Sequence, residues 1–169
     1  IRHILNTSGI YHYPEAQYDM VRLGIGLYGV GNDTTEQKQL QNVGTLKTVI
    51  LQIKQVPAGD SVGYGRRFMA HQPVSVATLP VGYADGIRRG WGNGKGYVTI
   101  HGRKAPILGS VCMDMLMADV TGIDCKEGDT AVVFGENPTV HEMADVLETI
   151  PYEILTSISQ RVKRVFYKE

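Results

Sequence analysis

Glycine and proline spacing is the feature that most constrains the fold of this chain. Twenty glycines and seven prolines divide the 169 residues into short runs that are rich in β-branched side chains. Such runs between turn-forming residues are typical of short strands and leave little room for long helices. We therefore predict a mainly β fold, an antiparallel barrel or sandwich with a few short helices. The expected strands span residues 45–56, 74–81, 97–100, 105–109, 115–120, 131–134 and 161–167.

Helical signals come late in the sequence. Thr139 has the side chain of an N-cap, and a glutamate follows three residues later, ahead of an apolar stripe. Pro151 suits the first position of a second short helix. The polar segment 31–42 is typical of a loop or linker, which predicts that residues 1–35 belong to a different unit from the β-rich residues 36–169.

Charge and hydropathy argue against several classes of partner. The chain has 17 basic and 17 acidic side chains and no long run of one sign, unlike proteins that bind nucleic acid or anionic membrane surfaces. No apolar run approaches the roughly 20 residues that span a bilayer, and the first residues lack the regions of a signal peptide. Cys112 and Cys125 have no paired CxxC spacing. We expect a soluble, cytoplasmic protein with reduced thiols that binds a small molecule or another protein.

Metal and nucleotide motifs are absent from the sequence. It contains neither a phosphate-binding P-loop pattern nor a strand-coupled GxGxxG. The histidines do not follow a metal-binding spacing such as HExxH, so we assign no metal. They are His3, His12, His71, His101 and His141.

Two tyrosines lie in glycine-rich turns where side chains can be pushed into a cleft. Tyr64 stands in VGYGRR, and Tyr83 stands in GYADG directly after a predicted strand. A tyrosine hydroxyl acts as a base near neutral pH only where cations or dipoles stabilise the phenolate. Taken alone, Tyr64 is more typical of a packed turn tyrosine, and the segment of Tyr83 is more typical of a loop whose aspartate bonds its own backbone.

Three further groups combine polar and small residues. In GSVCMDM, Cys112 is best interpreted as a buried structural cysteine, and Met113 as an apolar filler or a backbone donor to a ligand. Arg22 lies inside an apolar run and therefore needs a defined partner, either a structural ion pair or an anion near the glycines that follow it. The trio that begins at Asn6 suits either a helix cap or a phosphate-binding turn.

The order of these motifs is more specific than any one of them. The segments HILNTSG, VRLGIGLYG, VGYGRR, LPVGYADG, RKAPILGSVCMDM, TIPYEILTSIS and RVKRVF succeed one another along nearly the whole chain. Together they resemble the carboxy-terminal portion of alanine racemases, and are similar in particular to forms fused behind a ligase that joins UDP-N-acetylmuramoyl-tripeptide to D-alanyl-D-alanine.

The resemblance implies a two-domain enzyme that interconverts L- and D-alanine with pyridoxal 5'-phosphate and supplies D-alanine for peptidoglycan. Residues 1–35 would be the last segment of the (β/α)8 barrel that binds the cofactor, and residues 36–169 the β-rich carboxy-terminal domain. The lysine that holds the cofactor covalently would lie in the earlier part of the barrel. No lysine of this chain replaces it, so the resemblance implies that these residues alone are inactive.

The family's motifs also imply roles for individual residues. Tyr64 would be the second acid/base, acting on the face of the substrate Cα opposite the lysine, because racemisation needs one base on each face. Tyr83 would shape the entrance, the backbone of Met113 would contact the substrate carboxylate, and Asp114 would lie nearby. Arg22 would face the pyridine nitrogen of the cofactor. The phosphate would be bound by Asn6, Thr7, the backbone of Gly24 and Ile25, and the hydroxyl of Tyr152.

Two positions depart from the family's pattern. Thr7 stands where serine is usual, although its hydroxyl can still donate a hydrogen bond, and Lys163 stands where proline is usual in RVKR. The resemblance further implies a homodimer in which Tyr64 and Met113 of one chain complete the cofactor site of the other. The alternatives are an amino-acid decarboxylase of the same architecture, with a cysteine near Cys112 as proton donor, and a non-catalytic β-barrel module that binds a partner protein.

Overall fold

The computed structural model describes residues 1–167 and divides the chain into two compact units, Ile1–Thr45 and a larger one that begins at Leu46. The division falls after Thr45, whereas the sequence placed it near residue 35. That the first unit is the end of a cofactor-binding barrel stays a prediction.

The first unit consists of short helical segments held by side-chain caps. The side chain of Asn6 accepts a hydrogen bond from the amide of Gly9 and begins α1, and Asp33 caps α2 in the same way. The loop predicted at 31–42 therefore contains a helix, which a single capping aspartate induces in a polar segment. The segments are α1 (Thr7–His12), η1 (Pro14–Ala16), η2 (Ile25–Tyr28) and α2 (Thr34–Gln37), where η denotes a 3₁₀ turn.

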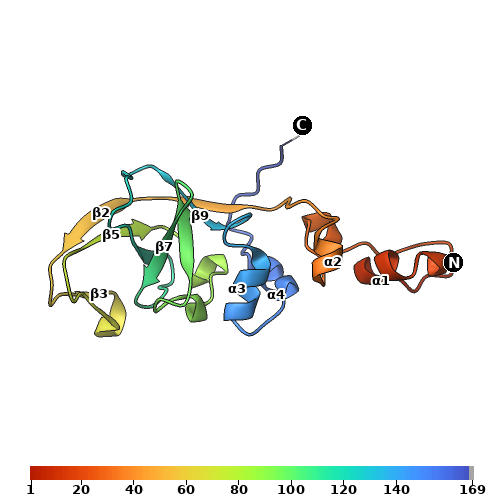
Figure 1. Ribbon diagram of the computed structural model, residues 1–169, viewed down its shortest axis with the longest axis horizontal. Helices are drawn as coiled ribbons and strands as arrows, with labels where there is room; N and C mark the ends of the chain where they lie inside the picture. Colours follow the sequence, from red (N-terminus) through yellow and green to blue (C-terminus); the bar gives the residue numbers. More distant parts are fainter. Residues whose placement is uncertain (168–169) are drawn as a thin grey trace. The chain divides into compact units, whose positions relative to one another are not determined.

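The second unit is built on an antiparallel, curled sheet, which confirms the predicted fold class (Figure 1). In the described part of the chain this sheet has seven strands in the order β1-β9-β6-β7-β8-β5-β2, and a separate hairpin joins β3 to β4. The strands are β1 (Leu46–Val49), β2 (Gln52–Val56), β3 (Ser61–Val62), β4 (Phe68–Met69), β5 (Val74–Leu79), β6 (Tyr97–Ile100), β7 (Arg103–Leu108), β8 (Leu116–Asp119) and β9 (Thr130–Phe134).

The strand expected at 45–56 is two strands that lie at opposite edges of the sheet. β1 pairs with β9, and β2 pairs with β5. The exchange of partner occurs across one peptide bond, because the amide of Ile50 donates to Asp129 and the amide of Leu51 donates to Thr78, both at 2.9 Å. Figure 1 shows the segment running on continuously from one edge of the sheet to the other.

Five predicted strands are confirmed within two residues at each end, but the strand predicted at 161–167 is wrong. The range begins in a turn instead, in which the amide of Val162 donates to the carbonyl of Ser159 at 3.1 Å. Arg164 donates to the backbone oxygens of Ile158, Ser159 and Val162 at 3.0 to 3.2 Å. The two-residue strands β3 and β4 were not predicted, since they are too short to show an alternating pattern.

Two helices pack beside the sheet and share its core (Figure 1). α3 (Val140–Val146) begins at Thr139, whose hydroxyl accepts the amide of Glu142, and α4 (Pro151–Ser157) has its proline at the first position, as predicted. The core that they cover is apolar and closed to solvent. Its fully buried members include Leu79, Trp91, Val98, Ile107, Leu116 and Met143.

No helix among residues 1–167 combines the length and the apolar character that crossing a membrane would need.

Candidate active site

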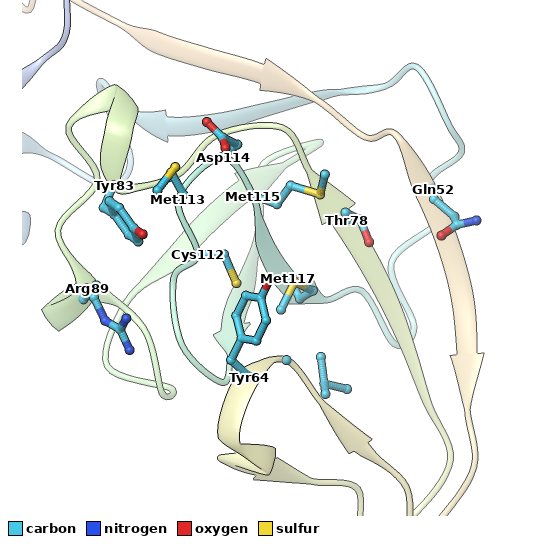
Figure 2. Close-up of a pocket in the computed structure, with 12 residues that line it drawn as sticks. Gln52, Tyr64, Thr78, Tyr83, Arg89, Cys112, Met113, Asp114, Met115 and Met117 are labelled. Carbon is cyan, nitrogen blue, oxygen red and sulfur yellow. The ribbon is translucent and has the colours of Figure 1, made fainter.

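A cavity of about 900 Å³ lies on the second unit between the β3–β4 hairpin, the turn after β5 and the loop before β8. Figure 2 shows side chains from these segments facing one another across it. The cavity gathers four of the residues singled out from the sequence, Tyr64, Tyr83, Met113 and Asp114. Since two tyrosines line a real cavity, the alternative of a binding module without a tyrosine-lined cleft is not supported.

Tyr64 is presented by a turn that its glycine neighbours make possible. Gly63 and Gly65 have φ values of 75° and 67°, in the left-handed region that glycine adopts without a Cβ penalty. Arg66 also has a positive φ of 50°, and its Nε donates to the hydroxyl of Ser61 at 3.2 Å. The turn leaves the Tyr64 side chain 77% exposed, with its ring directed toward Cys112 and Met117 in Figure 2.

The loops that carry Tyr83 and Met113 are joined through their backbones. The amide of Tyr83 donates to the carbonyl of Cys112 at 2.9 Å, and the amide of Ala84 donates to that of Met113 at 3.0 Å. This approach requires glycine at position 82, because a Cβ there would lie 2.3 Å from the Cys112 carbonyl oxygen. The backbone hydrogen bonds between the two loops therefore fix the positions of Tyr83 and Met113 relative to each other.

Arg161, which does not line the cavity, also connects the same two loops. Its Nε donates to Asp85 and its Nη2 to Asp114, both at 2.7 Å. Burial opposes ionisation of Asp85, but the bonds from Arg161 and from the amide of Gly82 outweigh it and lower the pKa of that carboxyl. The two carboxylates, Asp85 first, raise the pKa of the Arg161 guanidinium in return. Asp85 and Arg161 thus form a charged pair at neutral pH, and the same guanidinium contacts Asp114.

Sequence reasoning missed several residues of this site. Arg161 was expected in a strand, and its two partners are 76 and 47 positions away, so no local pattern marks it. Arg89, Gln52 and Thr78 also line the cavity and were not singled out. Cys112 lies in the cavity wall as well and is half-buried, whereas the sequence favoured a fully buried structural role.

The first unit brings together the glycines and the threonine expected at a phosphate site. Thr7 is buried, and its Oγ1 accepts the amides of Gly24 at 3.0 Å and Gly26 at 3.4 Å. A Cβ at Gly26 would lie 2.8 Å from the Thr7 methyl, so the turn fits only around a glycine. Ile25 is buried beneath this turn.

The remaining cofactor candidates are distributed over both units. Asn6 uses its side-chain oxygen as the cap of α1, which confirms the capping interpretation of that residue. Arg22 is exposed instead of enclosed in apolar surroundings, and its Nη2 donates to the carbonyl of Ile4 at 3.0 Å. Tyr152 belongs to the second unit, in the first turn of α4, where it is 37% exposed.

One group in the first unit has the composition of a metal site. Ligand atoms of His12, Asp33 and Glu36 lie within 4.8 Å of one another, an arrangement that no sequence motif indicated. Hydrogen bonds account for it. Although burial disfavours the charged form of Glu36, the amide of Asn32 and the hydroxyl of Ser8 donate to its carboxylate and lower its pKa. We interpret the three side chains as a hydrogen-bonded group that stabilises α2.

Comparison with known proteins identifies the family of the chain. A sequence profile described as "Alanine racemase, C-terminal domain" matches residues 43–166, which include the whole cavity. The chain belongs to the alanine racemase family. Alanine racemase 1 of Clostridium acetobutylicum is 42% identical over 99% of the chain, and the match covers 45% of that enzyme. The chain therefore spans a little under half the length of the alanine racemases that it matches.

Solved alanine racemases have the same fold. The structure from Streptomyces coelicolor A3(2) matches 99% of this chain and 46% of its own with a TM-score of 0.91 at 35% identity. The structure from Bartonella henselae, described as having covalently bound pyridoxal phosphate, matches 98% and 46% with a TM-score of 0.87 at 36% identity.

Proposed function

We propose that this chain supplies part of the active site of a pyridoxal-phosphate-dependent alanine racemase, with Tyr64 as the acid/base on one face of the substrate. The observation that carries the proposal is the cavity of the second unit, into which a glycine-flanked turn directs the Tyr64 ring and which Met113 and Tyr83 also line. A racemase needs a proton acceptor and donor on each face of Cα, and this side chain provides one of the two.

The residues of the first unit fit the phosphate of the cofactor. A threonine hydroxyl has two acceptor lone pairs and one donor hydrogen. Because the amides of Gly24 and Gly26 take the lone pairs of Thr7, its hydrogen is left to donate to an anion. The glycine turn also leaves room beside that hydroxyl, since a Cβ on Gly24 would meet it at 3.8 Å. We therefore propose Thr7, Gly24, Ile25 and Asn6, with the hydroxyl of Tyr152, as the phosphate-binding set.

Arg22 is proposed to face the pyridine nitrogen of the cofactor. When bound, pyridoxal phosphate supplies the electron-withdrawing ring that makes the Cα proton of alanine removable. One nitrogen of the Arg22 guanidinium donates to the Ile4 carbonyl, which fixes the group while other N–H donors remain on it. Since a guanidinium retains its proton, Arg22 would keep the ring nitrogen unprotonated and moderate the electron withdrawal.

We further propose that a second copy of the chain covers the cavity. Tyr64 is 77% exposed, and Met113 and Met115, which line the same cavity, are 54% and 46% exposed. Apolar side chains gathered around a reactive group are typical of a surface that another protein surface closes. In the resulting homodimer Tyr64 and Met113 of one chain would serve the cofactor site to which its partner contributes Thr7 and Arg22.

The product of such an enzyme, D-alanine, would be used in the cytoplasm for peptidoglycan synthesis. Fusion of the enzyme to a ligase stays a prediction from the motifs quoted above.

The test replaces Tyr64 by phenylalanine in the complete enzyme and follows solvent deuterium entering Cα of L-alanine and of D-alanine separately. We expect exchange from L-alanine to be lost and exchange from D-alanine to persist in part through the base on the other face. Tyr13→Phe is the matched control, because Tyr13 is an exposed tyrosine of the first unit, outside the cavity. Unchanged exchange from both isomers would refute the role of Tyr64, and release of CO2 would indicate the decarboxylase instead.

A further inference from the structure

Arg161 is placed to control the charge of the cavity without lining it. It comes from the segment after α4 and reaches Asp85 in the turn η4 (Tyr83–Asp85) and Asp114 in the loop before β8. Asp114 is a wall residue of the cavity with a side chain that is 54% exposed. Arg161 thus bonds the carboxylate of a residue that belongs to the cavity wall.

The segment that carries Arg161 is held at several points. Its neighbour Ser159 donates its amide to the carbonyl of Asp85 at 3.1 Å. Arg164 secures the same segment through three backbone carbonyls at 3.0 to 3.2 Å. The backbone that carries Arg161 is therefore held in place by hydrogen bonds. From there the guanidinium donates to both carboxylates.

The direction of Asp114 matters as much as its charge. Figure 2 shows its carboxylate directed away from Tyr64, on the side of the loop opposite the tyrosine ring. The bond from Arg161 Nη2 holds it in this direction. Without that bond the side chain would be free to turn toward the cavity, and its charge would repel a bound carboxylate group.

We propose that Arg161 is a positioning residue for substrate binding: it holds Asp85 and Asp114 together and keeps the Asp114 charge from repelling the substrate carboxylate beside Met113. The inference rests on the proposed racemase function, which supplies the anionic carboxylate. It assigns Arg161 an effect on binding, since the side-chain hydrogen bonds of its guanidinium go to Asp85 and Asp114.

The test compares Arg161→Gln, Asp114→Asn and the double variant in the complete enzyme. We expect Arg161→Gln to raise KM for both alanine isomers about tenfold, the scale of a lost charge-assisted hydrogen bond, with kcat changed less than about threefold. Adding Asp114→Asn should restore most of the KM, because the uncompensated charge is then gone. Arg161→Lys, which keeps the charge but reaches one carboxylate at a time, should lie between the wild type and Arg161→Gln.

Arg164→Gln is the matched control. It weakens the same segment but leaves the bonds of Arg161 to both carboxylates in place, so any rise in its KM should not be reversed by Asp114→Asn. Binding of acetate, measured by calorimetry on the same proteins, follows the carboxylate site independently of turnover and should weaken in Arg161→Gln. A loss of kcat at constant KM and constant acetate affinity would overturn the proposal, as would a double variant no better than Arg161→Gln. Absence of racemisation in the wild type would refute the proposed function, and acetate binding would then still decide the role of Arg161.

Discussion

Replacing Gly82 by alanine should separate the loops that carry Tyr83 and Met113. The φ of Gly82 is −152°, an extended conformation that alanine adopts without strain. A Cβ at this position would, however, lie 2.3 Å from the carbonyl oxygen of Cys112 and 2.4 Å from that of Met113. Both obstacles are backbone atoms, so the loops themselves have to move.

The cost follows from the contacts that this movement breaks. Two backbone hydrogen bonds join the loops, from Tyr83 to Cys112 and from Ala84 to Met113. Each contributes about 1 kcal/mol net, and forcing a methyl group into a packed site costs about 1 to 3 kcal/mol more. We expect Gly82→Ala to lower the free energy of unfolding by about 3 to 5 kcal/mol.

Urea unfolding measures this loss, and amide hydrogen exchange at Tyr83 and Ala84 locates it. Gly44→Ala is the control, because a Cβ there would meet no atom within 4 Å and the backbone carries no positive φ. Its stability should stay within about 0.5 kcal/mol of the wild type. A loss at Gly82 below about 1 kcal/mol, with both amides still protected, would show that the loops are not held by this close approach.

Two further perturbations test other parts of the structure. Asp85→Asn should destabilise the protein at neutral pH. The difference from the wild type should begin to shrink as the pH falls toward 3.8, the ordinary pKa of the carboxyl, and should vanish only below the lowered pKa of the folded form. A difference in urea unfolding that does not shrink between about pH 5 and pH 2 would contradict the role of charge. Thr139→Ala removes the acceptor for the amide of Glu142 and should cost about 1 kcal/mol, with the far-ultraviolet helical signal of α3 reduced; an unchanged unfolding midpoint would show that the cap contributes nothing.

The parts of the fold that the sequence predicted are those determined by neighbours in the chain. β6 lies where a β-branched run is bounded by Gly96 and Gly102, and its limits were predicted correctly. The helix starts at Thr139 and Pro151 were likewise correct, because capping and proline act within a few residues. The strand expected at 161–167 failed because its first residues belong to a turn, in which the amide of Val162 donates to Ser159 and the carbonyl of Val162 accepts from Arg164.

The candidate site was predicted through its motifs and missed where it depends on tertiary structure. The glycines on either side of Tyr64 predict a turn that exposes the ring, and the structure contains that turn. Nothing in the sequence near Arg161 indicates that it would meet Asp85 and Asp114, because the three residues come from segments that only the folded sheet brings together. The exposure of Arg22 was also unexpected, since apolar neighbours in sequence do not fix which side of a short turn faces solvent.

The exchange of strand partners at Ile50 and Leu51 has a consequence for how the sheet withstands unfolding. Segment 46–56 pairs with β9 through its first half and with β5 through its second, so both margins of the sheet belong to one continuous stretch of chain. Detachment of this stretch would uncover the unpaired backbone of β9 and of β5 in a single event, the condition under which sheets pair with other molecules and aggregate. The same eleven-residue stretch, 46–56, thus forms both edges of the curled sheet, and a protease that cut it between its halves would free both edges at once.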